Sequence, residues 1–355
     1  MTEWKTYRLG DITIMRNGKK RPNTQGIYPV YGGNGIMDYT DCYNAENTII
    51  VGRVGAYCGN VYQSKGKCWV SDNAISVSAT ELVDSSFLYY LMSSVDFHHH
   101  HIGGAQPLMT QDIIGGFEIS LPSLEEQRRI AGILGAIDDK IENNRRINTN
   151  LELQAQALYK QWFVDSSTVK LGDVVRTTSG GTPSRSHMEF YVGKYGWVKS
   201  KELNSSFITK TEETITDDAI AKSAAKLLPA KSILIAMYGA TVGQYAILSQ
   251  PMTCNQAVCA LLPNENYPYT YLFMVAKNIK EELANKAIGS AQQNISQVII
   301  KDIDISSDIE KIRQFHKIVC PHFEVMEKNQ KENETLATLR DTLLPKLMNG
   351  EIKTE

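Results

Sequence analysis

The sequence predicts an α+β protein in which two similar domains, related by a pseudo-two-fold axis, are separated by two long antiparallel coiled-coil helices. Three observations support this prediction. The first part of the chain recurs later, each copy mixes short strands with short helices, and each copy is followed by a segment with a heptad pattern. We expect domains at 1–122 and 165–305, and helices within 123–164 and 306–355.

The two copies share short motifs in the same order along the chain. The matching pairs are Tyr7–Ile12 with Val169–Val174, Thr48–Val51 with Ser232–Ile235, and Gly103–Gln106 with Gly289–Gln292. The offsets are 162, 184 and 186 residues, so the second copy carries about 22 extra residues near its start. Self-similarity at this period predicts one structural unit used twice.

Each copy combines strand and helix patterns. Short β-branched runs bounded by glycines predict strands at Thr48–Val51, Ala74–Val77 and Ser232–Ala236. Short helices are expected at Ser86–Ser94 and Thr270–Ala287. Each copy is therefore predicted to be a compact α+β unit of about 120 to 140 residues.

A long helix is expected after each copy. Leu124–Phe163 contains no proline, and Ser123 is a suitable N-cap with Glu126 at the capping-box position. Apolar residues recur there at coiled-coil spacing, and the same seam recurs 185 residues later. Pro345 predicts that the second helix kinks or stops near Leu344. The expected interface positions are Ile137, Ile141, Asn144, Asn148, Leu151, Leu158, Met326, Asn329, Asn333, Leu336 and Leu343.

Two polar layers lie in the middle of each seam. Asn144 and Asn148 in the first helix match Asn329 and Asn333 in the second. If the helices run antiparallel, these asparagines meet near the centre, where they fix the register at some cost in stability. The alternative is that each helix packs only on its own domain.

Composition describes a globular chain of 355 residues. Hydrophobic residues make up 42% and charged residues 21%, and no apolar stretch is long enough to span a membrane. The N-terminus lacks the apolar core of a secretory signal, so we expect a cytoplasmic protein. The six cysteines form no Cys-x-x-Cys pair, which favours buried thiols over a zinc site or a disulfide framework.

No catalytic motif accompanies these features. The sequence lacks a phosphate-binding loop, a Gly-x-Ser-x-Gly elbow and a nuclease-type carboxylate site. Asn266–Tyr269 resembles the Asn-Pro-Pro-Tyr of amino-methyltransferases but lacks its first proline, which favours a loop. His98–His101 is either a metal-binding tract or, as we prefer, a polar helix end or loop beside the turn at Gly103 and Gly104. We expect no catalytic residue, metal or cofactor in this chain.

Several loops carry side chains suited to nucleic acid. Arg and Lys bind phosphates or guanine edges, and Asn and Gln read adenine. The candidate DNA contacts are Arg16, Lys19, Lys20, Arg21, Asn34, Asn73, Thr182, Arg185, Lys199, Lys201, Asn255 and Gln256. Lys199 and Lys201 are expected on one side of a strand, and the alternative for each candidate is a solvated loop. With a net charge of −2, any DNA binding must come from local basic clusters or from a basic partner that adds phosphate contacts.

Several stretches match the pattern of one known family, namely Leu9–Asp11, Ile119–Ile130, Leu171–Asp173, Ser179–Ser184 and Gly239–Gly243. Through them the whole chain resembles the specificity subunit of type I restriction–modification systems. The second copy departs from the family at Ser306–Glu310, where Leu-Pro-x-x-Glu-Gln is absent, so the start of the second helix is less well defined.

The resemblance implies that each copy is a target-recognition domain for one half of a split double-stranded DNA site. The helices would set the gap between the halves and dock two adenine-methylating subunits, and ATP-driven restriction/translocase subunits would join for cleavage. S-adenosylmethionine, ATP and Mg²⁺ would belong to those partners. Two rival classes are a self-contained enzyme with an unrecognised site and a protein-binding scaffold that uses the coiled coil without DNA.

Overall fold

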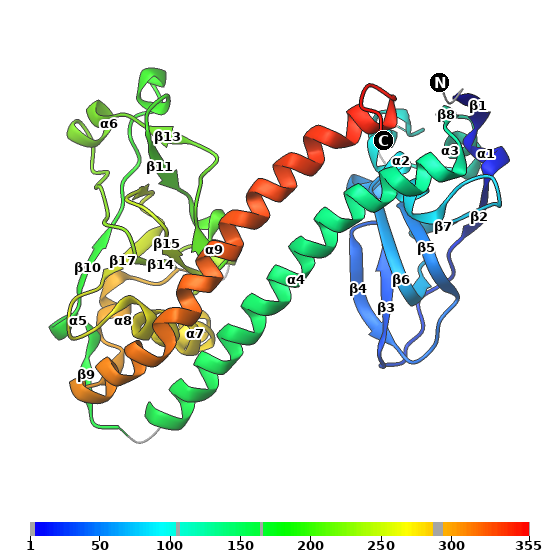
Figure 1. The fold of residues 1–355 in the computed structure, drawn as a ribbon. Coiled ribbons are helices and arrows are strands. Elements are labelled where there is room, and N and C mark those ends of the chain that lie inside the picture. Colours follow the sequence, from blue (N-terminus) through cyan, green and yellow to red (C-terminus); the bar gives the residue numbers. More distant parts are fainter. Residues whose placement is uncertain (1–3, 104–106, 164–165, 287–293, 355) are drawn as a thin grey trace. The chain divides into compact units, whose positions relative to one another are not determined.

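The computed structural model describes residues 4–103, 107–163, 166–286 and 294–354. The chain divides into two compact units, Met1–Ile141 with Thr335–Glu355, and Glu142–Glu334 (Figure 1). Each unit holds one copy of the repeat and one part of each long helix. The repeated motif at Gly103–Gln106 and Gly289–Gln292 lies outside the described residues except for Gly103.

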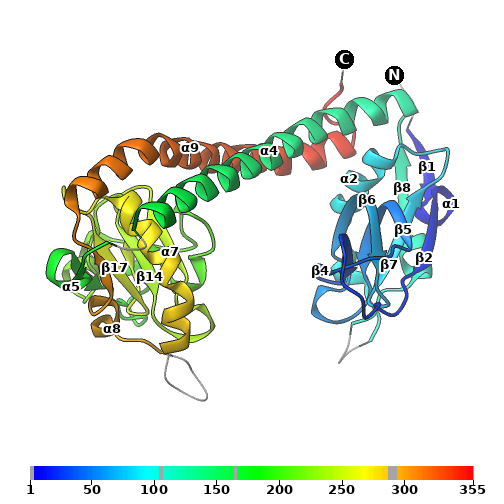
Figure 2. The same cartoon turned by 90° about the horizontal axis from the view of Figure 1, so that it is seen from below.

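The first copy is built around a mixed sheet of strand order β2-β7-β5-β6-β3-β4 and a small sheet β1-β8. Figure 2 shows β5, β6 and β7 side by side. Its elements are β1 Lys5–Arg8, α1 Leu9–Ile12, β2 Thr13–Asn17, β3 Tyr28–Gly32, β4 Gly35–Thr40, β5 Ala45–Gly52, η1 Gly55–Tyr57, β6 Val61–Val70, β7 Ala74–Ala79, α2 Ser85–Ser94, η2 Phe97–His100, α3 Gln111–Gly115 and β8 Glu118–Leu121.

The second copy has a sheet of order β10-β17-β14-β15-β12, a sheet β13-β11-β16 and the small sheet β18-β9. Its elements are β9 Thr168–Lys170, α5 Leu171–Val174, β10 Arg176–Ser179, η3 Met188–Tyr191, β11 Tyr195–Val198, η4 Ser200–Glu202, β12 Phe207–Ile208, β13 Thr214–Ile215, α6 Asp217–Ala221, β14 Ile233–Ala236, η5 Gly239–Thr241, β15 Tyr245–Leu248, β16 Thr253–Cys254, β17 Val258–Leu262, α7 Tyr269–Lys286, α8 Gln297–Lys301 and β18 Asp304–Ser306.

Strand pairing repeats between the copies. The order β2-β7-β5-β6 corresponds to β10-β17-β14-β15, and β1-β8 corresponds to β9-β18. The parallel rung Val30↔Trp69 has its counterpart in Trp197↔Thr253. The predicted strands and short helices are confirmed in β5, β7, β14, α2 and α7, although Ser232 precedes β14 and Ala287 lies outside the described residues.

The extra residues of the second copy lie between β11 and β14. They account for η4, β12 and α6, whereas β13 pairs with β11 as β4 pairs with β3. Strand β12 pairs with β15 at the edge of the sheet. Leu203, Ile208 and Leu228 from this segment form an apolar cluster with Leu234 and Ala260 on the sheet. The insertion therefore covers a sheet face with apolar side chains, which stabilises it by the hydrophobic effect.

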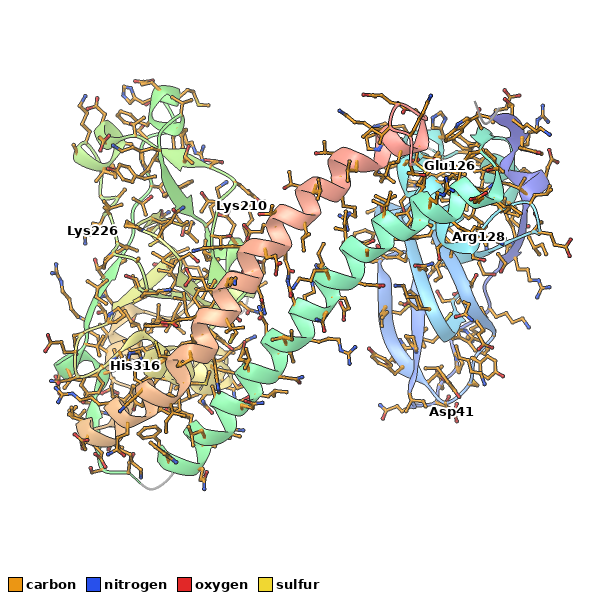
Figure 3. The ribbon with its side chains drawn as sticks, viewed as in Figure 1. Asp41, Glu126, Arg128, Lys210, Lys226 and His316 are labelled. Carbon is orange, nitrogen blue, oxygen red and sulfur yellow. The ribbon has the colours of Figure 1, made fainter. Side chains whose placement is uncertain are left out.

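The two long helices are α4, Leu124–Phe163, and α9, Ile309–Met348, each of 40 residues. The first helix begins where predicted, and Ser123 Oγ accepts from Glu126 N at 3.4 Å. The capping box is not completed, because the Glu126 carboxylate instead accepts from Thr354 Oγ1 at 2.7 Å (Figure 3). The second helix begins at Ile309, inside the segment 306–355 expected for it, and Asp304–Ser306 just before it pairs with β9.

The prediction that the second helix stops near Leu344 was wrong, and the alternative of a kink at Pro345 stays a prediction. The helix continues to Met348, and Asn349 N donates to Pro345 O at 3.1 Å. Leu343, Leu344, Leu347 and Met348 pack against the first unit's core, so burial offsets the hydrogen bond that the proline cannot make.

Polar contacts between the helices establish their antiparallel direction. Asn144 Nδ2 donates to Asn333 Oδ1 at 2.9 Å, and Asn329 Nδ2 donates to Asn148 Oδ1 at 2.8 Å. In the first unit, Arg340 Nη1 donates to Asp138 Oδ1 at 2.8 Å. Residue numbers therefore rise along α4 as they fall along α9, as the heptad pattern predicts.

The helices also pack on the sheet domain of their own unit. In the first unit, Ile130 and Leu134 of α4 join the core that contains Phe87. In the second unit, Phe323 of α9 contacts Phe273 of α7, with ring centroids 5.3 Å apart. Helix pairing and domain packing are thus both present, so the alternative of packing only on the domain does not hold.

We expect Asn144→Ala to lower the free energy of unfolding by about 1 to 3 kcal/mol. The substitution removes the hydrogen bonds that the fully buried Asn144 donates to Asn333 Oδ1 and Glu332 Oε2. Chemical denaturation measures this change. The matched control is Asn143→Ala, which truncates the exposed neighbouring asparagine. Equal effects of the two substitutions would show that the polar layer does not stabilise the helix pair.

Candidate nucleic-acid interface

A glycine lets one loop cross a strand end at the same place in both copies. A Cβ on Gly18 would lie 1.9 Å from Ser71 O, and a Cβ on Gly180 would lie 2.0 Å from Cys254 O. The backbone bonds match as well, since Gly18 N donates to Ala74 O at 3.0 Å and Gly180 N to Val258 O at 3.3 Å. A side chain at either position would displace the loop.

A tryptophan holds each of these loops. Trp69 Nε1 donates to Lys19 O at 3.2 Å, and Trp197 Nε1 donates to Gly181 O at 3.0 Å. The two tryptophans lie on opposite strands of the equivalent parallel rung. In each copy an indole N–H therefore fixes the loop by a hydrogen bond to its backbone, although the two tryptophans come from different strands.

The structure gathers the first copy's candidates around the Gly18 loop. Lys19 bridges to Ser71, and the exposed Asn73 follows in the adjoining turn. Asn34 is exposed in the turn between β3 and β4, and the neighbouring Gly33 packs near Asn73 O. Arg16 lies on β2, and Lys20 and Arg21 continue the exposed loop.

The second copy's candidates gather around the Gly180 loop. Thr182 Oγ1 hydrogen-bonds Gln256 Oε1, and Asn255 N donates to Val198 O at 2.9 Å. The guanidinium of Arg185 lies 4.0 Å from the centroid of Tyr191, whose hydroxyl donates to Pro183 O at 2.6 Å. These contacts join the loop, the end of β11 and the turn after β16.

The prediction that Lys199 and Lys201 lie on one side of a strand was wrong. Strand β11 ends at Val198, so Lys199 is the N-cap of the short turn η4 and Lys201 lies within that turn. The Glu202 carboxylate caps the turn by accepting from Lys199 N at 2.8 Å. Lys199 Nζ lies 2.6 Å from Glu213 and Lys201 Nζ lies 2.7 Å from Glu212.

The ion pairs keep both carboxylates charged. The hydrogen bond from Lys199 lowers the pKa of Glu213, and the hydrogen bond from Lys201 lowers the pKa of Glu212. At neutral pH the cluster therefore carries balanced charge instead of the positive patch that the lysines alone suggest. Sequence reasoning missed these acids because a Glu-Glu pair in a loop has the pattern of a solvated turn.

Lys226 is a further cation that the sequence patterns did not indicate (Figure 3). Its Nζ donates to Thr178 Oγ1 at 2.8 Å on β10, immediately before the Gly180 loop. The preceding Ala224 and Ala225 pack against Gly181, which places this segment beside the loop. Only the insertion brings Lys226 there, so no local motif marks it.

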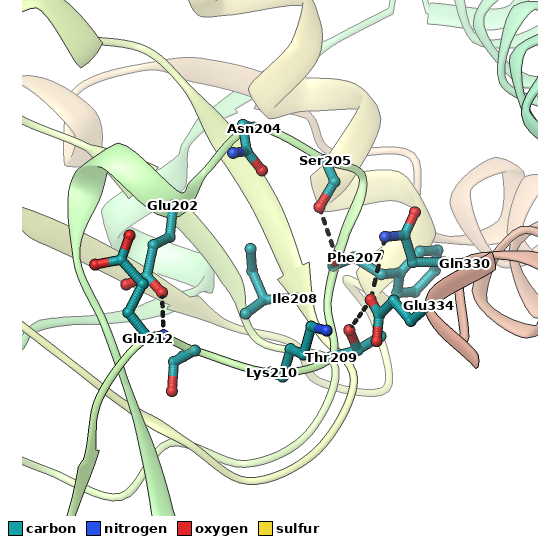
Figure 4. Close-up of a pocket in the computed structure, with 11 residues that line it drawn as sticks. Glu202, Asn204, Ser205, Phe207, Ile208, Thr209, Lys210, Glu212, Gln330 and Glu334 are labelled. Atoms are coloured by element: carbon teal, nitrogen blue, oxygen red, sulfur yellow. Dashed lines mark hydrogen bonds between the residues drawn. The ribbon is translucent and has the colours of Figure 1, made fainter. Parts of the chain in front are cut away.

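A polar hollow of about 360 Å³ lies between the insertion and α9 (Figure 4). Thr209 Oγ1 donates to Glu334, and Glu202 Oε1 accepts from Glu212 N at 2.7 Å. In the part of the chain that the structure describes, His, Cys, Asp and Glu form no group able to hold a metal ion. The hollow marks where the insertion docks on the helix.

The histidine run also engages its own neighbours. His98 Nδ1 lies 3.0 Å from Cys58 O, and His99 Nδ1 lies 2.6 Å from Asp96. The run occupies η2, the short helical turn after α2. This placement agrees with the interpretation as a polar helix end.

No helix among the described residues is long and apolar enough to cross a membrane.

Comparison with known proteins assigns the family. The model of the type I restriction modification DNA specificity domain matches residues 1–153 and 164–307. The chain is 25% identical to the HindI specificity subunit of Haemophilus influenzae, over 99% of this chain and 100% of that protein. It is 27% identical to the MjaIX specificity subunit of Methanocaldococcus jannaschii, over 100% and 90%.

A solved structure shows the same fold. The crystal structure of a type I restriction–modification S subunit from M. genitalium aligns with a TM-score of 0.65 at 19% identity, covering 98% of this chain and 96% of that one. With the family match over most of both copies, the chain belongs to the specificity subunits of type I restriction–modification systems, as a non-catalytic DNA-recognition subunit.

Proposed function

We propose that residues 1–122 and 165–305 each read one half of a bipartite DNA site, and that α4 and α9 set the gap between the halves. The observation that carries this proposal is the duplicated loop set. The Gly18 and Gly180 loops cross equivalent strand ends, and each gathers basic and amide side chains suited to phosphates and base edges.

The proposed DNA contacts remain the twelve candidates from the sequence, with Lys226 added. Lys19, Lys20 and Asn73 are exposed in the first copy, and Thr182, Arg185 and Gln256 are exposed in the second. Phosphate contacts would position each domain, and base contacts would select the sequence. Asn73, Asn255 and Gln256 are the proposed amide readers.

The partners are proposed from the family. Two methylating subunits would dock on the helices and add basic surface, and restriction/translocase subunits would complete the nuclease. S-adenosylmethionine, ATP and Mg²⁺ would bind those partners, because the family to which this chain belongs supplies recognition. The chain's near-neutral charge supports a function that depends on partners.

The experiment that tests this function is adenine-methylation mapping in a genome that expresses this chain with its methylating subunits. We expect one bipartite motif with a constant gap. Random or absent methylation would contradict the proposal. A gel shift with the co-expressed methylating subunit distinguishes it from a protein scaffold, because a scaffold would give no specific DNA complex.

Salt dependence should separate exposed lysines from paired ones. In the complex, Lys19→Ala with Lys20→Ala should lower the slope of log affinity against log salt by about one unit per lost phosphate contact. Lys199→Ala with Lys201→Ala should weaken binding with a smaller slope change, because Glu212 and Glu213 already neutralise these lysines.

The control for this measurement is Lys5→Ala, on β1 and outside the gathered loops. Fluorescence titrations at several salt concentrations measure the slopes. Affinity and slope that stay unchanged on replacing Lys199 and Lys201 would remove both lysines from the interface.

A further inference from the structure

An arginine–carboxylate pair recurs in the two recognition domains. Arg21 Nη2 lies 2.8 Å from Asp38 Oδ2, and Arg185 Nη2 lies 2.8 Å from Glu213 Oε2. Both arginines belong to the loop that begins at the strand-crossing glycine, Gly18 or Gly180. Each acid lies on a separate segment of the chain.

Strand register shows that the two acids occupy equivalent positions. Asp38 on β4 pairs with Val30, which pairs in turn with Trp69 on the parallel strand. In the second copy, Trp197 N donates to Glu213 O at 3.0 Å, and Trp197 pairs with Thr253. The loops that lead to Asp38 and Glu213 differ in length and sequence, yet both deliver a carboxylate to the same rung.

Stability does not explain this recurrence. The side chains are 48% and 38% exposed in the first pair, and 50% and 29% exposed in the second. Ion pairs with this exposure contribute little to folding because water and salt screen them. What such a pair does provide is a fixed direction for the guanidinium.

The second pair shows how the guanidinium is oriented. Tyr191 lies 4.0 Å and Trp197 lies 5.2 Å from the Arg185 guanidinium carbon, measured to the ring centroids, and these contacts hold its plane. Glu213 Oε2 forms an ion pair with Nη2 at 2.8 Å. The remaining N–H groups are therefore oriented and available to a ligand.

The carboxylate also selects the kind of ligand. A phosphate beside Arg185 would approach the Glu213 anion and be repelled by it, whereas a neutral base edge would not. Guanine presents two acceptors, O6 and N7, which match the arginine fork. A lysine with a single point charge does not reproduce this bidentate match.

We propose that Arg21 and Arg185 each read a guanine in their own half-site, and that Asp38 and Glu213 are the positioning residues for these arginines. This inference rests on the proposed function. It distinguishes the two arginines from the exposed Lys19 and Lys20, which would contact phosphates.

The test maps methylated adenines for single variants in the complex with the methylating subunits. Arg185→Lys should relax one guanine position in one half-site, with discrimination lower by about 5- to 150-fold, and leave the other half-site unchanged. Arg21→Lys should do the same in the opposite half-site. Glu213→Gln and Asp38→Asn should each relax the position read by their own arginine without a change in thermal unfolding.

The matched control is Asp304→Asn, which breaks an exposed ion pair with Lys170 in the small sheet β18-β9. It should leave the motif unchanged. Adding Glu213→Gln to Arg185→Lys should have no further effect on base preference, since the carboxylate acts through the arginine.

Two outcomes separate this inference from the function on which it rests. If the unaltered complex marks a bipartite motif and the arginine variants lower methylation without changing any base preference, the guanine assignment is overturned while the function stands. If the unaltered complex marks no bipartite motif, the proposed function is overturned and this inference with it.

Discussion

A seven-residue helical insertion in both long helices is expected to lengthen the gap between the half-sites by about three base pairs. Seven residues add about 10 Å at about 1.5 Å per residue, and the heptad seam is preserved. The structure indicates the insertion points, after Ile141 in α4 and after Thr335 in α9. Antiparallel pairing of Asn144 with Asn333 places these two points opposite each other.

These points leave the neighbouring contacts within each unit intact. The hydrogen bond between Arg340 and Asp138 lies in the first unit, before the insertion in α4 and after the insertion in α9. The asparagine layers and the hydrogen bond between Thr209 and Glu334 lie in the second unit. Both half-sequences should survive. Affinity should fall, because about three base pairs rotate the second groove by about 100° at a helical repeat of about 10.5 base pairs.

Methylation mapping of the insertion variant measures the gap directly. The control is a four-residue insertion at the same points, which breaks the heptad seam and should abolish specific methylation. A seven-residue variant that keeps the original gap would show that the helices do not set the spacing.

The second large effect is partner dependence. The isolated chain should bind its own site weakly, and affinity in physiological salt should rise by orders of magnitude in the complex with methylating subunits. The net charge of −2 leaves little counterion release to drive binding, and acids already pair with Arg21, Arg185, Lys199 and Lys201.

Titration of a labelled duplex by the chain alone and by the complex measures this difference. A duplex with one altered half-site serves as the specificity control. Nanomolar binding of the specific site by the isolated chain would refute partner dependence.

Features carried by local or periodic patterns were predictable from the sequence. The heptad spacing identified α4 and α9, because a coiled-coil seam constrains every third or fourth residue. The expected two-fold relation of the two copies implied antiparallel pairing, in which the matched asparagines meet. Repeated motifs identified two copies of one fold. Basic and amide residues in glycine-rich loops identified the loops that gather at the strand ends, because glycines mark tight turns and close approaches.

Features that depend on distant neighbours were decided only by the tertiary structure. Strand pairing brings Asp38 to Arg21 and Glu213 to Arg185, and no spacing in the sequence encodes those meetings. Burial of Leu347 carries α9 past Pro345, against the local preference of that residue. Local patterns thus determined the elements and their repeat. The charge surrounding each candidate contact arose from chain segments that only folding brings together, because electrostatic interactions depend on distance in space and not on distance along the chain.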